Sequence, residues 1–231
     1  MIVVAIVHYR HMYVEIFIKD CYGWQKRKET SKYYIKRRYF IHNLFTGERQ
    51  MTNNYTVLHC HTEQSLLDST TNHRNYADKA KKLGQTAIAY TEHGNINIWV
   101  EKKMYCDSIG IKYIHGMECY LTERLYWLNE DGEQIKKRDN YHTILLAKNY
   151  EGVKELNRLF YTSKMKDHFY YSPRLTFDEF LSISDNIIKI SACLASPLNQ
   201  YRKTNNKAFE KLLCAYDYYE IQPHDFAEQK E

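Results

Sequence analysis

Short runs of apolar and β-branched residues alternate, from residue 55 onward, with longer stretches whose apolar positions recur at helical spacing. This alternation is typical of βα units, in which paired strands are covered by helices. We predict strands near residues 55–59, 86–91, 112–120, 142–147, 186–192 and 218–222. We predict helices over residues 76–83, 98–109, 150–161, 177–183 and 207–214. This order favours a parallel sheet, either open or closed into a barrel.

The composition is that of an ordinary globular protein. The length of 231 residues suits one large α/β domain, or a smaller domain with an appendage. With 44% hydrophobic and 26% charged residues, disorder, a collagen-like repeat and a coiled coil are all disfavoured. The opening apolar run, residues 1–7, is too short for a membrane span and lacks the features of a secretory signal. The six cysteines are scattered singly, so we expect a cytoplasmic protein without disulfides.

The positive charge is concentrated at the N-terminal end. Residues 1–50 hold ten Lys or Arg against four Asp or Glu, a balance of +6, while the rest of the chain has 23 against 24, or −1. Aromatic residues are interleaved with these cations, a pattern that favours a polyanionic partner such as nucleic acid. The alternatives are a solvated edge hairpin, or an extension foreign to the natural product, with Met51 as the true start.

Candidate metal ligands gather at the predicted strand ends. His59 and His61 end the first strand, and because side chains alternate across a strand, both project from one face. The second strand closes with Glu92 and His93, a carboxylate and an imidazole that leave the sheet as the chain turns. The carboxyl ends of strands in a βα sheet converge on one face, so these distant residues are expected to share a pocket.

Three further candidates follow the same logic, although each has a purely structural interpretation. Glu118 lies in the third strand, where it also suits a capping or paired carboxylate. Cys193 follows the fifth strand and, taken alone, fits a small buried hydrophobic residue. His142 opens the fourth strand, and a parallel barrel would put it on the wrong face. Either that strand begins earlier than predicted, or its direction differs.

The same segments carry a family resemblance. The runs 58–68, 91–95, 116–120, 141–148, 191–194 and 220–224 resemble, in order, motifs of the PHP (polymerase and histidinol phosphatase) domain, in the version found in the alpha subunit of bacterial DNA polymerase III. The resemblance covers residues 55–231 and leaves residues 1–50 outside as a basic N-terminal extension. It implies a distorted seven-stranded β/α barrel that holds up to three ions, generally Zn²⁺ or Mn²⁺. By motif match the metal ligands would be His59, His61, Asp68, His93, Glu118, His142 and Cys193.

The chain departs from the family pattern in three places. Glu92 stands where the family commonly has aspartate, and Ser69 replaces a usual glycine. The sequence also stops at Glu231, before the family's last barrel strand and the asparagine-aspartate-x-histidine motif that supplies two further ligands. We therefore expect a barrel that is incomplete at its C-terminus. A fragment, a split gene product and a truncated remnant would each account for this end.

The implied reaction is phosphoester hydrolysis, which in this family takes the form of a metal-dependent 3′ to 5′ exonuclease. We predict that Glu92 and His224 take part in catalysis, His224 through a contact with substrate phosphate. We also predict that Arg174 contacts substrate phosphate, because guanidinium groups bind phosphate oxygens in a bidentate manner. The expected partners are DNA and the remainder of a polymerase III alpha-type polymerase, in the same or a separate chain, in a bacterial or phage-infected cell.

Two other functions remain open on the sequence. One is a non-catalytic interaction module that packs against the rest of a split polymerase. The other is a small-molecule phosphatase of the histidinol-phosphatase type. The second is disfavoured because the runs 116–120 and 145–148 resemble the polymerase branch of the family.

Overall fold

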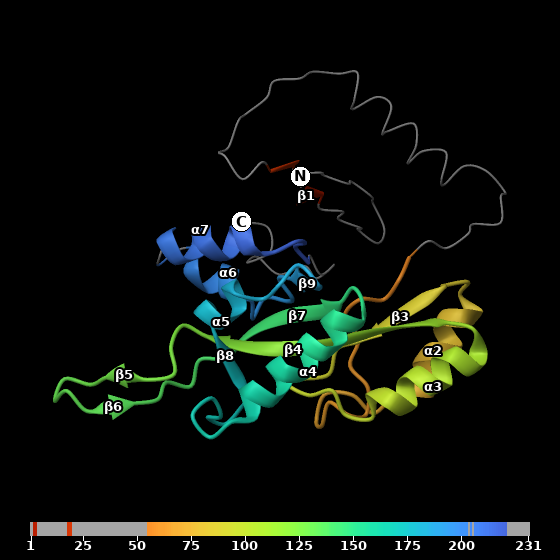
Figure 1. Ribbon diagram of the computed structural model, residues 1–231, viewed down its shortest axis with the longest axis horizontal. Coiled ribbons are helices and arrows are strands. Elements are labelled where there is room, and N and C mark those ends of the chain that lie inside the picture. The colour runs from red at the N-terminus through yellow and green to blue at the C-terminus, as the bar shows by residue number, and fades with distance from the viewer. Residues whose placement is uncertain (1, 4–17, 20–54, 203, 205, 221–231) are drawn as a thin grey trace, which may run out of the picture.

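The computed structural model describes residues 2–3, 18–19, 55–202, 204 and 206–220 (Figure 1). The predicted extension over residues 1–50 therefore lies almost wholly outside the described residues. Its two described pieces, β1 (Ile2–Val3) and β2 (Ile18–Lys19), pair in antiparallel fashion. None of the described helices has the length and apolarity that crossing a membrane requires.

The predicted helices and the four predicted strands within residues 86–192 are confirmed, with short elements added. The main sheet contains β3 (Ala87–Tyr90), β4 (Lys112–Thr122), β7 (Tyr141–Ala147), β8 (Arg174–Thr176) and β9 (Ile187–Ile190). Strands β5 (Trp127–Leu128) and β6 (Gln134–Ile135) form a small hairpin. The helices are α2 (His73–Lys82), α3 (Trp99–Ile109), α4 (Tyr150–Lys164), α5 (Phe177–Leu181), α6 (Pro197–Tyr201) and α7 (Asn206–Ala215).

Local sequence signals explain where several helices begin and end. The side chains of Asn72, Asn149 and Thr176 cap α2, α4 and α5 by accepting a hydrogen bond from a backbone N–H of the first turn. Glu179 completes a capping box with Thr176. Helix α3 ends at Gly110, whose φ of 75° belongs to the left-handed region that glycine adopts without strain.

The main sheet is mixed in direction, with the order β3-β4-β7-β9 and with β8 beside the end of β4. β4 runs parallel to β3 and β8, whereas β7 is antiparallel to both β4 and β9. The all-parallel pairing expected from the sequence is therefore wrong for β7. This reversal accounts for His142. His142 is the second residue of β7 and pairs with Tyr120, so it lies near the end of the sheet where β3, β4 and β9 finish.

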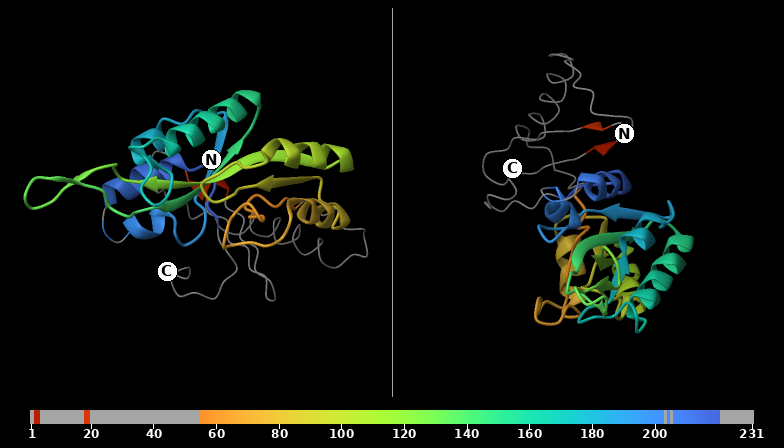
Figure 2. Two further views of the ribbon diagram at one scale, coloured as in Figure 1. Left: turned by 90° about the horizontal axis from the view of Figure 1, so that it is seen from below. Right: turned by 90° about the vertical axis from the view of Figure 1, so that its left-hand side faces the viewer.

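Single bridges flank both edges of this sheet. Val57 pairs with Ile88 of β3 at one edge, and Tyr218 pairs with Ile190 of β9 at the other. The strands predicted around residues 55–59 and 218–222 are reduced to these bridges within the described part of the chain. With helices packed around the sheet, the fold is a mixed α/β partial barrel (Figure 2).

Alternation along β4 separates the apolar core from the polar rim. Met117, Cys119 and Leu121 are buried in the large core that α4, α5, α6 and α7 cover. Glu118 and Tyr120, one position away from these residues, point to the opposite face of the strand. Helices α2 and α3 lie together at the β3 end of the sheet, while the β5–β6 hairpin projects away from the other end (Figure 1).

The inner face of the sheet is tightly packed around Gly116. Ile144, Leu146 and Ile190 belong to a small apolar cluster there. A Cβ at Gly116 would lie 2.6 Å from the Leu146 Cδ2 atom and 2.9 Å from the Thr91 Cγ2 atom. Only glycine therefore fits at this position without movement of the neighbouring strands.

We expect Gly116→Ala to destabilise the protein by about 1–3 kcal/mol, because overpacking forces side chains or strands apart. The free energy of unfolding in urea measures this change. Glu130→Ala, at an exposed position between β5 and β6, is the control. Equal stability of Gly116→Ala and wild type would contradict the tight packing.

Candidate metal centre

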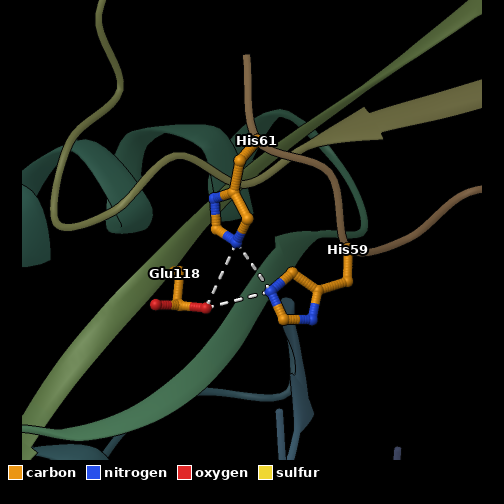
Figure 3. Close-up of side chains that lie close together, drawn as sticks. All are labelled: His59, His61 and Glu118. Carbon is orange, nitrogen blue, oxygen red and sulfur yellow. Dashed lines mark hydrogen bonds and ion pairs between the residues drawn. The ribbon is translucent and has the colours of Figure 1, made fainter. Parts of the chain in front are cut away.

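Glu118 is the central group of the site, and it is 1% exposed. Its Oε2 atom lies 2.9 Å from His59 Nε2 and 3.5 Å from His61 Nε2 (Figure 3). Its Oε1 atom lies 2.6 Å from His93 Nδ1 and 2.9 Å from His142 Nδ1. One buried carboxylate thus contacts four imidazoles that come from three separate segments of the chain.

The strand ends deliver these imidazoles to one place. His59 and His61 share a face of the segment that pairs with β3, and their Nε2 atoms lie 2.9 Å apart. His93 follows β3 and stacks on His61, with ring centroids 4.1 Å apart and an angle of 9° between the planes. His142 comes from β7, whose reversed direction puts the start of that strand beside Glu118.

Two further predicted ligands adjoin this core. The Asp68 carboxylate lies 3.4 Å from His93 Nε2, and 49% of its side chain is exposed. The Cys193 thiol, just past β9, lies 3.6 Å from His142 Nδ1. Leu67 and Ala192, which precede these two ligands, have φ values of 67° and 58°. Such backbone conformations are strained in non-glycine residues and are common at functional sites.

We call the seven gathered side chains the rim cluster: His59, His61, Asp68, His93, Glu118, His142 and Cys193. Six of them form three overlapping groups in which the possible ligand atoms all lie within 4.8 Å of one another. The groups are His59-His61-Glu118, His61-Asp68-His93 and His93-Glu118-His142. The structure thus brings the predicted ligands together, and their function as ligands stays a prediction.

The polar atoms of the rim cluster suit a bound cation. His93 Nδ1 and Glu118 Oε1 are buried and lie only 2.6 Å apart, but their orientation does not give a well-formed hydrogen bond. Buried polar atoms of this kind are costly unless another group satisfies them. Imidazole nitrogens, carboxylates and a thiol form a donor set that suits Zn²⁺, and the oxygen ligands also admit Mn²⁺.

Proton affinities at the rim cluster are strongly shifted. Burial lowers the pKa of His59, but hydrogen bonds to Glu118 and Glu220 outweigh this effect and raise it to about 10. Burial likewise opposes protonation of His142, yet hydrogen bonds to Cys193 and Glu118 raise its pKa to about 9. For Glu118, burial disfavours the charged form, but hydrogen bonds from His142 and the other imidazoles hold its pKa far below the usual range.

Glu92, assigned to catalysis from the sequence, lies outside the three ligand groups and is 1% exposed. Its Oε1 atom accepts from the Lys102 ammonium at 2.6 Å and from the Thr62 hydroxyl at 2.5 Å. Its Oε2 atom accepts from the Ser65 hydroxyl at 2.6 Å and from the backbone N–H of Thr62 at 2.9 Å. Through these four hydrogen bonds, Glu92 holds the loop that contains Thr62 and Ser65.

Ser65 connects Glu92 to two histidines of the rim cluster. Its hydroxyl donates to Glu92, and its oxygen accepts from the backbone N–H of His93 at 3.1 Å. The same oxygen lies 3.3 Å from His61 Nδ1, which can donate to it. This arrangement turns His61 Nε2 toward Glu118 and His59. Glu92 thus helps to position two histidines of the rim cluster, and its role in catalysis stays a prediction.

Arg174 is fully buried at the start of β8 and does not contact the rim cluster. Its Nη1 atom donates to the carbonyl oxygens of Lys137 and Asp139 at 2.6 and 3.1 Å, and to the Asp139 carboxylate at 3.2 Å. Its Nε atom donates to the carbonyl oxygen of His168. These bonds give Arg174 a structural role, because they fix the return of the β5–β6 hairpin to the sheet, and its contact with substrate phosphate stays a prediction.

Sequence reasoning did not assign a role to Glu220, which the structure brings to the rim cluster. Its two carboxylate oxygens lie 2.9 and 2.8 Å from His59 Nδ1. The signal was present in the sequence, because Glu220 opens the last motif of the family resemblance. His224, the other residue assigned to catalysis, lies outside the described residues.

We expect Arg174→Lys to destabilise the protein by about 1–3 kcal/mol, because a single ammonium cannot donate to all the carbonyl oxygens that the buried guanidinium satisfies. Metal content per folded chain should not change. Urea unfolding and elemental analysis measure these two quantities. Arg158→Lys, an exposed position on α4, is the control. A stable variant with reduced metal content would contradict the structural role.

Metal-free protein should lose stability as the pH rises from about 6.5 to about 10. The folded-state pKa values of His59 and His142, about 10 and about 9, exceed the ordinary value of 6.5. The folded state therefore binds more protons than the unfolded state does between these pH values. The stabilisation is complete below 6.5 and is lost as the pH passes through the folded-state values. Urea midpoints measured with a chelator across the window test this, and a midpoint that rises with pH would contradict it.

Comparisons with known proteins agree with the geometry. The family model of the PHP domain matches residues 58–223. The DNA polymerase III subunit alpha of Borreliella burgdorferi is 33% identical over 180 residues, which cover 74% of this chain and 15% of that protein. The corresponding subunit of Aquifex aeolicus is 32% identical over 195 residues, 78% of this chain and 16% of that protein. The chain thus spans about one sixth of the length of these relatives.

A solved structure from Bifidobacterium adolescentis, described as a metal-dependent phosphoesterase, covers 71% of this chain and 76% of its own, with 13% identity and a TM-score of 0.45. The match to the PHP family model, residues 58–223, covers well over half of the sequence. From this match we conclude that the chain belongs to the PHP domain family.

Proposed function

We propose that this PHP domain binds Zn²⁺ or Mn²⁺ ions, up to three, through the seven residues of the rim cluster and hydrolyses phosphoester bonds at the 3′ end of DNA. In this proposal it acts as the 3′ to 5′ exonuclease part of a polymerase III alpha-type polymerase. The remaining polymerase regions would belong to the same or a separate chain. The bacterial relatives support a cytoplasmic location, in a bacterial or phage-infected cell.

One observation carries the proposal: four imidazoles surround the buried carboxylate of Glu118 at contact distance. An assembly of this kind needs cations to balance it, since buried carboxylates and unpaired ring nitrogens are costly. Protons supply those cations in the metal-free protein, as the raised pKa values of His59 and His142 indicate. Metal ions replace protons at such ligands and release them on binding.

The ligand residues differ in their access to solvent, which suggests where substrate enters. Glu118 forms the closed floor of the site, whereas 25% of the His93 side chain and 49% of the Asp68 side chain are exposed. A phosphodiester would approach from the side of these two residues. When bound, Zn²⁺ or Mn²⁺ would acidify a water molecule and neutralise the charge that develops on the phosphoryl oxygens. The chain itself fixes these ions and orients its imidazole rings.

The test compares metal content and hydrolysis in the purified chain. We expect Zn²⁺ or Mn²⁺ in near-stoichiometric amounts, and release of nucleotides from the 3′ end of single-stranded DNA that stops when a chelator is added. His61→Ala should lower metal affinity at least about tenfold, because an imidazole ligand is lost outright. His168→Ala is the control, since His168 bonds to Glu179 outside the rim cluster.

Each alternative gives a different result in the same experiment. Metal-free wild-type protein whose stability does not respond to added Zn²⁺ or Mn²⁺ would contradict the metal centre. Bound metal without hydrolysis of DNA or of a small phosphomonoester would contradict the enzyme and favour the non-catalytic interaction module. Faster hydrolysis of the phosphomonoester than of DNA would favour the small-molecule phosphatase.

A further inference from the structure

The two edges of the main sheet meet at the rim cluster. The segment around Val57 lies beside β3, and the segment around Tyr218 lies beside β9, so they flank opposite edges. A flat sheet would hold these segments far apart. Here His59, two residues after Val57, contacts Glu220, two residues after Tyr218. The sheet therefore curves enough to bring the segments at its two edges into contact beside the rim cluster.

Glu220 is held firmly at the end of β9. Its backbone N–H donates to the Ser191 hydroxyl at 2.9 Å, and the backbone N–H of Ser191 donates to the carbonyl oxygen of Tyr218 at 3.1 Å. From this position both carboxylate oxygens reach His59 Nδ1, at 2.9 and 2.8 Å. The side chains of His59 and Glu220 are 15% and 20% exposed, so water screens the contact only in part.

The contact decides which ring nitrogen of His59 faces the cluster. A carboxylate accepts hydrogen bonds, so Glu220 favours a proton on Nδ1. In a neutral imidazole the lone pair is then on Nε2, the atom that lies 2.9 Å from Glu118 Oε2 and from His61 Nε2. A second carboxylate behind a metal-binding histidine fixes both the tautomer and the orientation of the ring.

We propose that Glu220 is a positioning residue that acts through His59, and that it links metal binding to the seating of the segment 218–220 against β9. The inference rests on the proposed function, because it takes the rim cluster to be a metal site. The linkage is reciprocal: if the seated segment favours metal binding, bound metal favours the seated segment by the same factor. The segment 218–220 thereby becomes part of the metal centre without supplying a ligand.

The experiment measures Zn²⁺ affinity by competition with a chromogenic chelator. We expect Glu220→Gln to weaken Zn²⁺ binding about 10- to 100-fold, the range found when carboxylates behind metal ligands are lost. Glu220→Asp should recover part of the affinity, because it keeps the carboxylate. Glu210→Gln, an exposed position on α7, is the matched control and should bind as wild type does.

Two further readouts separate positioning from a general loss of stability. In ¹⁵N NMR spectra of the Zn²⁺-loaded wild type, His59 should carry its proton on Nδ1, and Glu220→Gln should shift that proton resonance. Hydrogen exchange over residues 216–220 should slow when Zn²⁺ is added to wild type and change less in the variant. Ser191→Ala removes the hydrogen-bond acceptor of the Glu220 backbone N–H but keeps the Glu220 carboxylate. It should weaken Zn²⁺ binding less than Glu220→Gln does, and it replaces that variant in the test if Glu220→Gln folds poorly.

The outcomes distinguish this inference from the proposed function. Wild-type protein that binds Zn²⁺, together with a Glu220→Gln variant of equal affinity and an unchanged His59 ring, would overturn the inference and leave the metal centre intact. Wild-type protein that binds neither Zn²⁺ nor Mn²⁺ would overturn both.

Discussion

A buried carboxylate must be balanced, and the structure around Glu118 follows from that constraint. At 1% exposure the group has almost no contact with water, so its charge depends on the groups that surround it. Four imidazoles meet this requirement, and they can do so only because the ends of β3 and β4 and the start of β7 share one rim. The direction of each strand is therefore tied to the electrostatics of the site.

Much of this arrangement could be predicted from the sequence. Apolar periodicity located β3, β4, β7 and β9 and most of the helices, because long amphipathic segments carry a strong signal. It missed β5, β6, β8 and α6, which are two to five residues long and too short for a period to emerge. The direction of β7 depends on pairing between distant segments, and no local pattern encodes it.

Part of the candidate site could also be predicted from the sequence, and part could not. Residue type, position near the strand ends and the family resemblance together were enough to predict which side chains gather in the rim cluster. The sequence patterns could not predict which neighbouring groups bond to the side chains of Glu92 and Arg174. Lys102 donates to Glu92, and the carbonyl oxygen of Lys137 accepts from Arg174. No sequence pattern links either lysine to its partner. Glu92 and Arg174 are both buried and support the chain, and their roles in chemistry stay predictions.

The reversal of β7 has a consequence for how this fold can vary. Because β4 and β7 are antiparallel neighbours, the segment that joins them leaves and returns at the same rim, and it needs no crossover helix. A tight turn would satisfy the pairing as well as the β5–β6 hairpin does. Insertions or deletions between β4 and β7 can thus change the surface at this end of the sheet while the strand register stays untouched.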